Sequence, residues 1–193
     1  NGASGLSRDA AAQLSQDQYN ISTQPIQSGV YALLNNDSDI LSDKLVRKAL
    51  QAATNTSEIQ KKVGEGTPPL NLPYTDLQLE GDAPGAPSFD VAKARKLLDE
   101  AGWKLEGDTR KKDGKELSLS VVTTKNSEYE RALETLIGQW RQLGIVINER
   151  VIDAADPTQN FVQSVLQTRS YDVLLYQLTM GRDPDVFAYW HSS

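Results

Sequence analysis

Strand-like and helix-like segments alternate through the second half of the chain, and this order constrains the fold more than any other feature. Apolar runs over 117–122, 145–152 and 171–178 are typical of strands, and the last is apolar enough to be buried on both faces. Between them, apolar residues recur at helical spacing over 127–143, and Asp156-Pro157 is a typical helix start. Because this order favours βαβ crossovers, it predicts an α/β fold with helices on the faces of a sheet.

The first half predicts further elements. The run 29–34 predicts a strand, and the alternation over 19–23 a second one. Capping residues then mark three helix starts, because Ser, Asp and Asn side chains accept hydrogen bonds from free backbone N–H groups. We expect one helix after an N-cap at Ser42, another from the capping box of Asn55 and Glu58, and a third over 90–102. A further capping box over 127–130 opens the long helix.

Two irregular stretches frame these elements. Residues 1–28 are a partly irregular lead-in, and 64–88 form a proline-rich loop of a length that is usually functional or lies across another domain. Residues 103–122 carry Gly107 and the pair Asp113-Gly114, which predict hairpin turns. The 193 residues suit a single domain that can bury its own core.

The expected ligand site lies at the end of the last strand. In α/β sheets ligands bind outside the carboxyl ends of the strands, which indicates the segment that leaves the strand 171–178. We therefore expect the ligand-binding residues to be Tyr176, Gln177, Thr179, Met180 and Arg182. Arg182 would either serve an anionic or polar ligand or be a solvated surface arginine.

The residues needed for most catalytic or metal chemistry are sparse. The chain has no cysteine and one histidine, His191, so thiol nucleophiles and two-histidine metal sites are excluded. A net charge of −6 argues against a nucleic-acid partner. We expect no catalytic residue, no metal and no cofactor. Asp183 precedes a proline at an expected helix start and is interpreted as a cap; an acid-based hydrolase using Asp183 and Asp185 is the remaining enzymatic alternative.

Several motifs together carry a family resemblance. The runs YALLN at 31–35 and SDKLVRKALQAA at 42–53, followed by DVAKARKLLDEAGW at 90–103, resemble segments of bacterial solute-binding proteins of the peptide/nickel (oligopeptide-binding) class. Leu143-Gly144-Ile145, Tyr171-Asp172, Asp183-Pro184-Asp185 and the run YWHSS at 189–193 are also similar to that class. The resemblance covers about 29–193 and occurs in family order and spacing.

The resemblance implies a fold, a function and partners. It implies that 1–193 is a single C-terminal lobe with the periplasmic-binding-protein-like fold and a mixed sheet, excised from a two-lobed parent. The parent would bind a small solute or peptide between this lobe and an N-terminal lobe, and deliver it to ABC importer membrane subunits without catalysis. It would be extracytoplasmic, periplasmic or at the cell surface, and held at the membrane by a lipoprotein N-terminus that this chain does not contain.

One residue departs from the family pattern. Peptide-binding members carry an aspartate that pairs with the amino group of the ligand, and the position aligned with it here is Met180. Because methionine cannot neutralise an ammonium group, the usual recognition of a peptide N-terminus is not expected. The alternative to an importer component is the ligand-sensing lobe of a transcriptional regulator with the same fold.

Overall fold

A computed structural model describes residues 3–6, 8–15, 17–22, 28–64, 70 and 87–179. The elements in chain order are α1 (Arg8–Ala12), β1 (Ser28–Leu34), α2 (Lys44–Ala52), α3 (Thr56–Val63), α4 (Val91–Glu100), β2 (Lys104–Glu106), β3 (Thr109–Lys112), β4 (Lys115–Glu116), β5 (Ser118–Thr124), α5 (Ser127–Arg141), β6 (Val146–Ile152), the π-helix η2 (Val162–Gln167) and β7 (Val173–Thr179). No helix in the described ranges is long and apolar enough to cross a membrane.

The main sheet is mixed, as predicted. Its strand order is β1-β7-β5-β6, with β5 parallel to both β6 and β7. The units β5-α5-β6 and β6-η2-β7 are the two βαβ crossovers that the alternation predicts. β1 enters from the first half of the chain and pairs antiparallel with β7, from Ser28 opposite Thr179 to Leu34 opposite Val173.

A small antiparallel sheet of β2, β3 and β4 forms the predicted hairpin region. Both of its turns use the residues that the sequence indicates. Gly107 has a φ of 63°, and Asp113 and Gly114 have φ values of 52° and 75°. Two consecutive residues at positive φ match the twist of the flanking strands, which is the chemistry expected of Asp-Gly turns.

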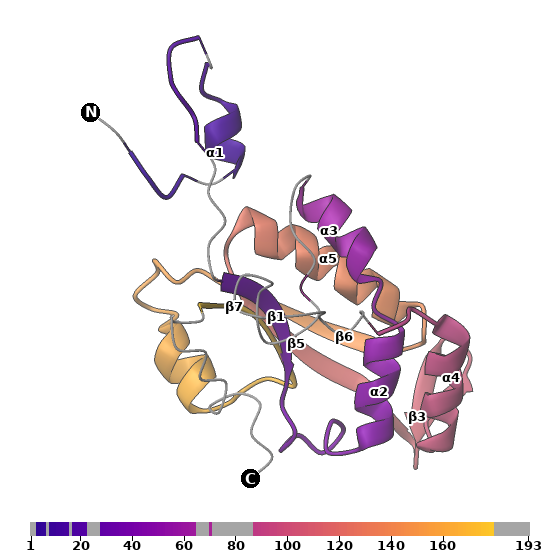
Figure 1. Cartoon of the computed structure of the whole chain (residues 1–193). Coiled ribbons are helices and arrows are strands. Elements are labelled where there is room, and N and C mark those ends of the chain that lie inside the picture. Colours follow the sequence, from indigo (N-terminus) through magenta and orange to yellow (C-terminus); the bar gives the residue numbers. More distant parts are fainter. Residues whose placement is uncertain are drawn as a thin grey trace, which may run out of the picture.

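The helices cover both faces of the main sheet (Figure 1). On one face α5, α2, α3 and α4 share the larger core with alternate residues of β5 and β7, and Trp140 at its centre is 2% exposed. On the other face, η2 and the residue before it, Phe161, pack on Val122 and Leu174. Two faces packed by helices explain why β7 is a nearly continuous apolar run.

Two helix starts differ from the prediction by one residue. α2 is capped by Asp43 and not by Ser42, because the Ser42 hydroxyl donates to the carbonyl of Asp39 in the preceding turn while Asp43 accepts from Leu45 N at 2.8 Å. α5 is capped by Asn126, whose side-chain oxygen accepts from the first-turn N–H groups. The predicted caps Asn55 of α3 and Asp90 of α4 are confirmed.

Two other predicted elements are wrong. Asp156-Pro157 does not begin a helix, because the Asp156 carboxylate accepts from the backbone N–H and hydroxyl of Thr158 and closes a turn, so the helix starts only at Val162. Residues 19–22, expected to be part of a strand, are not in one. The helix expected after Asp183-Pro184 lies outside the described residues.

Candidate functional site

The ends of four strands form one edge of the main sheet. β5, β6 and β7 run parallel, so Thr124, Ile152 and Thr179 at their carboxyl ends lie at the same edge. β1 runs the other way, which places its first residue, Ser28, directly opposite Thr179. We call this the carboxyl-end edge. It is the edge at which α/β sheets present side chains to ligands.

The predicted site residues that the structure describes do not all face the same way. Gln177 faces α5, where the Tyr129 hydroxyl donates to its side-chain oxygen. Tyr176, the neighbouring residue, faces η2, and its ring centroid lies 5.5 Å from that of Phe161. Thr179 is exposed at the end of β7. Successive side chains of a strand point to opposite faces, so a run of site residues along β7 is necessarily split.

Met180 and Arg182, also predicted as site residues, lie outside the described residues. The same holds for most of the proline-rich loop, and for the two aspartates of the hydrolase alternative. The structure therefore leaves these predictions as they stand.

Both polar atoms of the Gln177 amide are engaged within the chain. Its oxygen accepts from Tyr129 and its nitrogen donates to the Ser28 hydroxyl at 2.8 Å. Tyr129 lies in the first turn of α5, and burial raises the pKa of its hydroxyl above 10.0. Ser28 and Tyr129 were missed from the sequence. One local signal could have indicated Tyr129. It lies in the predicted first turn of a helix that directly follows a strand of the parallel set, close to the edge where ligands bind.

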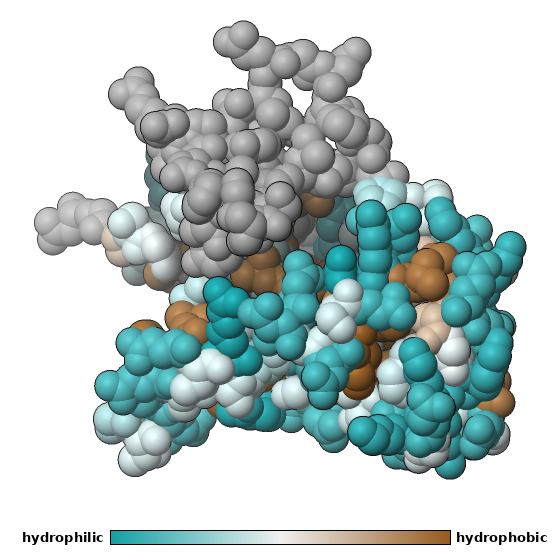
Figure 2. Space-filling view, turned by 90° about the horizontal axis from the view of Figure 1, so that it is seen from below, coloured by the Kyte–Doolittle hydropathy of each residue, from teal (hydrophilic) through white to brown (hydrophobic). Residues whose placement is uncertain are grey.

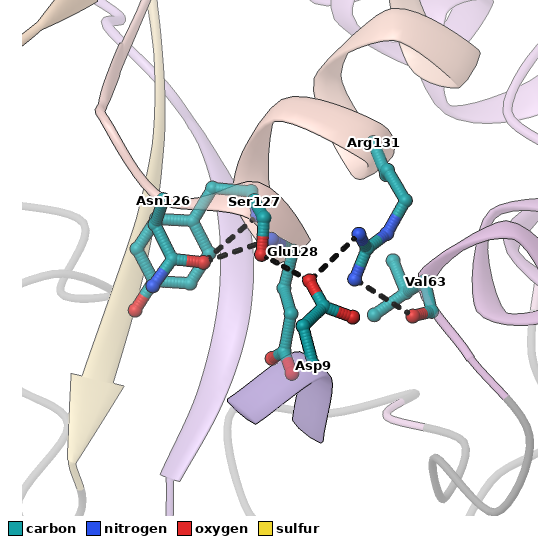
Figure 3. A network of polar contacts seen from close by, with 7 residues as sticks. Asp9, Val63, Asn126, Ser127, Glu128 and Arg131 are labelled. Carbon is teal, nitrogen blue, oxygen red and sulfur yellow. Dashed lines mark hydrogen bonds and ion pairs between the residues drawn. The ribbon is translucent and has the colours of Figure 1, made fainter. Parts of the chain in front are cut away.

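A second polar cluster joins the lead-in to α5 at the same edge (Figure 3). The Asp9 carboxylate of α1 accepts from the Ser127 hydroxyl at 2.8 Å and lies 3.2 Å from the Arg131 guanidinium. Arg131 also donates to the carbonyl of Val63, the last residue of α3, at 3.5 Å. Acidic side chains are favoured near a helix N-terminus, which suits Asp9 to this place. Neither Asp9 nor Arg131 was anticipated.

An exposed ion pair continues the edge beyond β5 and β6. Lys125 Nζ lies 3.1 Å from the Asp153 carboxylate. This hydrogen bond holds the pKa of Asp153 below its ordinary 3.8 and raises the pKa of Lys125 above 10.5. Within the described ranges, no group of three or more His, Cys, Asp or Glu side chains is placed to hold a metal ion.

The proline-rich loop contacts the sheet close to this edge. A Cβ added at Gly29 would lie 2.2 Å from Leu70 Cδ2 and 3.1 Å from the Tyr31 ring. The absent side chain at Gly29 therefore leaves the space in which Leu70 lies against β1. Leu70 belongs to the predicted proline-rich loop 64–88.

A surface hollow of about 480 Å³ lies at the opposite edge, near the amino ends of β5 and β7. Figure 2 views the molecule from the end where β1 leads into α2, and this face is mostly hydrophilic. Asp172 lines the hollow, but both of its carboxylate oxygens are used: Oδ1 accepts from the Ser38 hydroxyl at 2.5 Å and Oδ2 from Ser120 N at 2.7 Å. The Asp172 carboxylate therefore links the start of β7 to β5 and to the turn after β1, and its role is structural.

Comparison with known families gives one decisive match. Residues 3–193 match the family of bacterial extracellular solute-binding proteins, family 5 Middle. The chain belongs to this family. The mixed α/β fold with helices on its faces is confirmed by its likeness to solved structures. The oligopeptide-binding protein AppA from Bacillus subtilis in complex with a nonapeptide superposes with a TM-score of 0.72 at 22% identity, over 84% of this chain and 33% of that one.

Other similar proteins agree with this match. NikA from Brucella suis, solved in complex with Fe(III)-EDTA, gives a TM-score of 0.69 at 25% identity over 86% of this chain and 33% of that one. In sequence, the oligopeptide-binding protein OppA of Lactococcus lactis is 34% identical over 119 residues, 56% of this chain and 19% of OppA. AppA of Bacillus subtilis is 26% identical over 177 residues, 86% of this chain and 31% of AppA. The chain thus spans between a fifth and a third of the length of these relatives.

Proposed function

We propose that this chain is the C-terminal lobe of a two-lobed solute-binding protein, and that it supplies one half of a cleft for an oligopeptide. The observation that carries the proposal is the family 5 match over 3–193 combined with oligopeptide-binding relatives that are several times longer. The carboxyl-end edge is the surface that this lobe offers to the cleft, because the polar groups of β1, β7 and α5 gather there.

The arrangement of β1 and β7 supports a second lobe at this edge. Ser28 and Thr179 are register partners, so the chain reaches and leaves the main sheet at one point. A lobe held on two adjacent strands can move as a body when a ligand draws the lobes together. Binding energy would then favour the closed state, which the membrane subunits of an ABC importer would recognise.

The further expectations follow from this role. The protein acts outside the cytoplasm, which its membership of a family of extracellular solute-binding proteins supports, and a lipidated N-terminus of the parent would hold it at the membrane. It binds and releases its ligand without catalysis. A relative from Brucella ovis whose name is that of a putative ABC transporter peptide-binding protein favours an importer component over the regulator alternative.

Isothermal titration of the full-length protein tests the ligand class. The probes are an equimolar pool of synthetic nonapeptides and, separately, Fe(III)-EDTA, because a nonapeptide is bound in the AppA structure and Fe(III)-EDTA in the NikA structure. We expect heat with the peptide pool, a raised thermal midpoint, and no measurable heat with residues 1–193 alone, since half of the contacts are then absent. Heat with the chelate and none with peptides would overturn the peptide assignment.

A further inference from the structure

The hydrogen bonds of Tyr129, Gln177 and Ser28 form a relay with a fixed direction across three elements. The Gln177 side-chain oxygen can only accept, so Tyr129 must donate to it. The Gln177 amide nitrogen can only donate, so Ser28 must accept from it, at 2.8 Å. The direction therefore runs from α5 through β7 to the first residue of β1.

This direction determines what the Ser28 hydroxyl can still do. A hydroxyl that accepts one hydrogen bond retains its own O–H as a donor, and that O–H must point away from the Gln177 amide. Ser28 is the first residue of β1 and is only partly buried, opposite the exposed end of β7 at Thr179. The remaining donor therefore lies at the carboxyl-end edge.

Strand pairing alone does not explain the relay. β1 and β7 are already joined by seven consecutive register pairs, so the side chains are not needed to hold the strands together. Tyr129 is suited to a donor role, since a tyrosine hydroxyl is protonated at neutral pH and burial raises its pKa further above 10.0. The relay instead fixes the orientation of the Ser28 hydroxyl, which the backbone pairing of β1 and β7 would leave free to rotate.

We propose that Ser28 is a ligand-contacting residue, whose hydroxyl donates a hydrogen bond to an acceptor such as a backbone carbonyl of a bound peptide, and that Gln177 and Tyr129 are positioning residues for it. The inference rests on the proposed function and deepens it. It changes the role of Gln177, which the sequence predicts as a direct ligand contact: both atoms of its amide already have partners, and it acts through Ser28.

The test uses the full-length protein and a single defined nonapeptide recovered from the pool. Ser28→Ala should raise Kd by about 3- to 10-fold, the range that corresponds to one hydrogen bond. Ser28→Thr, which keeps the hydroxyl, should restore Kd to within about 2-fold. Tyr129→Phe should raise Kd by about 2- to 5-fold, and the double variant Ser28→Ala/Tyr129→Phe should bind no more weakly than Ser28→Ala, because Tyr129 acts only through Ser28.

Two matched variants control for the chemical changes themselves. Ser42→Ala removes a hydroxyl from the turn before α2, and Tyr171→Phe removes one beside the hollow at the amino ends of β5 and β7, both on the side of the sheet away from the carboxyl-end edge. Both should leave Kd unchanged. All variants are compared by their thermal midpoints, which a purely structural relay would lower without changing Kd.

The outcomes separate this inference from the proposed function. If the wild-type protein binds no peptide, both are overturned. If the wild type binds and Ser28→Ala binds equally well, only the role of Ser28 is overturned. If the effects of Ser28→Ala and Tyr129→Phe on Kd add, the positioning role of Tyr129 is overturned.

Discussion

The guanidinium of Arg110 lies 2.6 Å from the carboxylate of Asp99, and the two side chains differ sharply in burial: Arg110 is 3% exposed and Asp99 is 46% exposed. The buried partner is held by more than the ion pair. Arg110 also donates to the carbonyls of Leu143 at 2.8 Å and Trp103 at 2.6 Å. Arg110 therefore joins α4, the small sheet and the end of α5.

Replacing Arg110 should destabilise the fold strongly. Arg110→Ala leaves two carbonyls without their donor, and we expect a loss of about 2–4 kcal/mol in the free energy of unfolding, mostly from these bonds because the exposed Asp99 contributes little. Arg110→Lys should recover only part of the loss, since an ammonium group cannot reproduce the planar fork. Urea unfolding measures both. The exposed Lys115→Ala should change stability by less than about 0.5 kcal/mol, and equal losses for the two alanine variants would contradict the assignment.

Asp172 should be sensitive to the loss of one acceptor. In Asp172→Asn the amide nitrogen cannot accept, so either the Ser38 hydroxyl or Ser120 N loses its partner, at a cost of about 1–3 kcal/mol. Asp37→Asn is the matched control, because Asp37 forms an exposed pair with Arg169. Thermal unfolding should rank Asp172→Asn well below Asp37→Asn, and similar midpoints would argue against this role.

Gly144 and Gly107 allow backbone strain to be separated from crowding. Both have positive φ, 83° and 63°. An added Cβ at Gly144 would lie 2.7 Å from Leu105 Cδ1 and 3.2 Å from the Asp108 carbonyl oxygen, whereas Gly107 has nothing within 4 Å. Gly107→Ala should cost about 1 kcal/mol from φ alone, and Gly144→Ala measurably more, by chemical denaturation. A larger loss at Gly107 would show that the close approach at Gly144 has no consequence.

The Lys125–Asp153 pair gives a pH-dependent contribution with a definite sign. The pKa of Asp153 is lowered in the folded state, so its contribution to stability is present above the ordinary value of 3.8 and is lost as the pH falls through the lowered value. Lys125→Met should return the pKa of Asp153 toward 3.8, as followed by NMR of the side-chain carboxyl carbon. Asp156, whose pKa is lowered by Thr158, should not move. A pKa of Asp153 unchanged by Lys125→Met would rule out the ion pair as the cause.

The βαβ order could be predicted because it depends on periodicity along the chain. The alternation from 117 to 178 was sufficient for the parallel pairs, and hence for the edge at which β7 ends. The caps predicted at Ser42 and Ser127 are wrong by one residue, because in each case the serine has a polar neighbour that is equally suited to be the N-cap, Asp43 or Asn126. In each case, the serine hydroxyl donates to a different acceptor, the Asp39 carbonyl or the Asp9 carboxylate.

The relay could not be predicted in the same way. Tyr129 and Gln177 are 48 positions apart, and Gln177 and Ser28 are 149 apart. Their contact depends on β1 lying beside β7, an antiparallel neighbour that no local pattern specifies. The sequence correctly indicated that Gln177 lies near the carboxyl end of β7. Its partners Tyr129 and Ser28 could be identified only once the order of the strands in the sheet was known.

The pairing of Ser28 with Thr179 also has a consequence for protein engineering. The Cα atoms of register partners in an antiparallel ladder are only about 5 Å apart. The two ends of a tight surface loop in another protein are separated by a similar distance. A segment with such ends can replace a loop tip in a host scaffold without forcing the host strands apart. The part of the chain between these two residues therefore has the geometry of a transplantable insert.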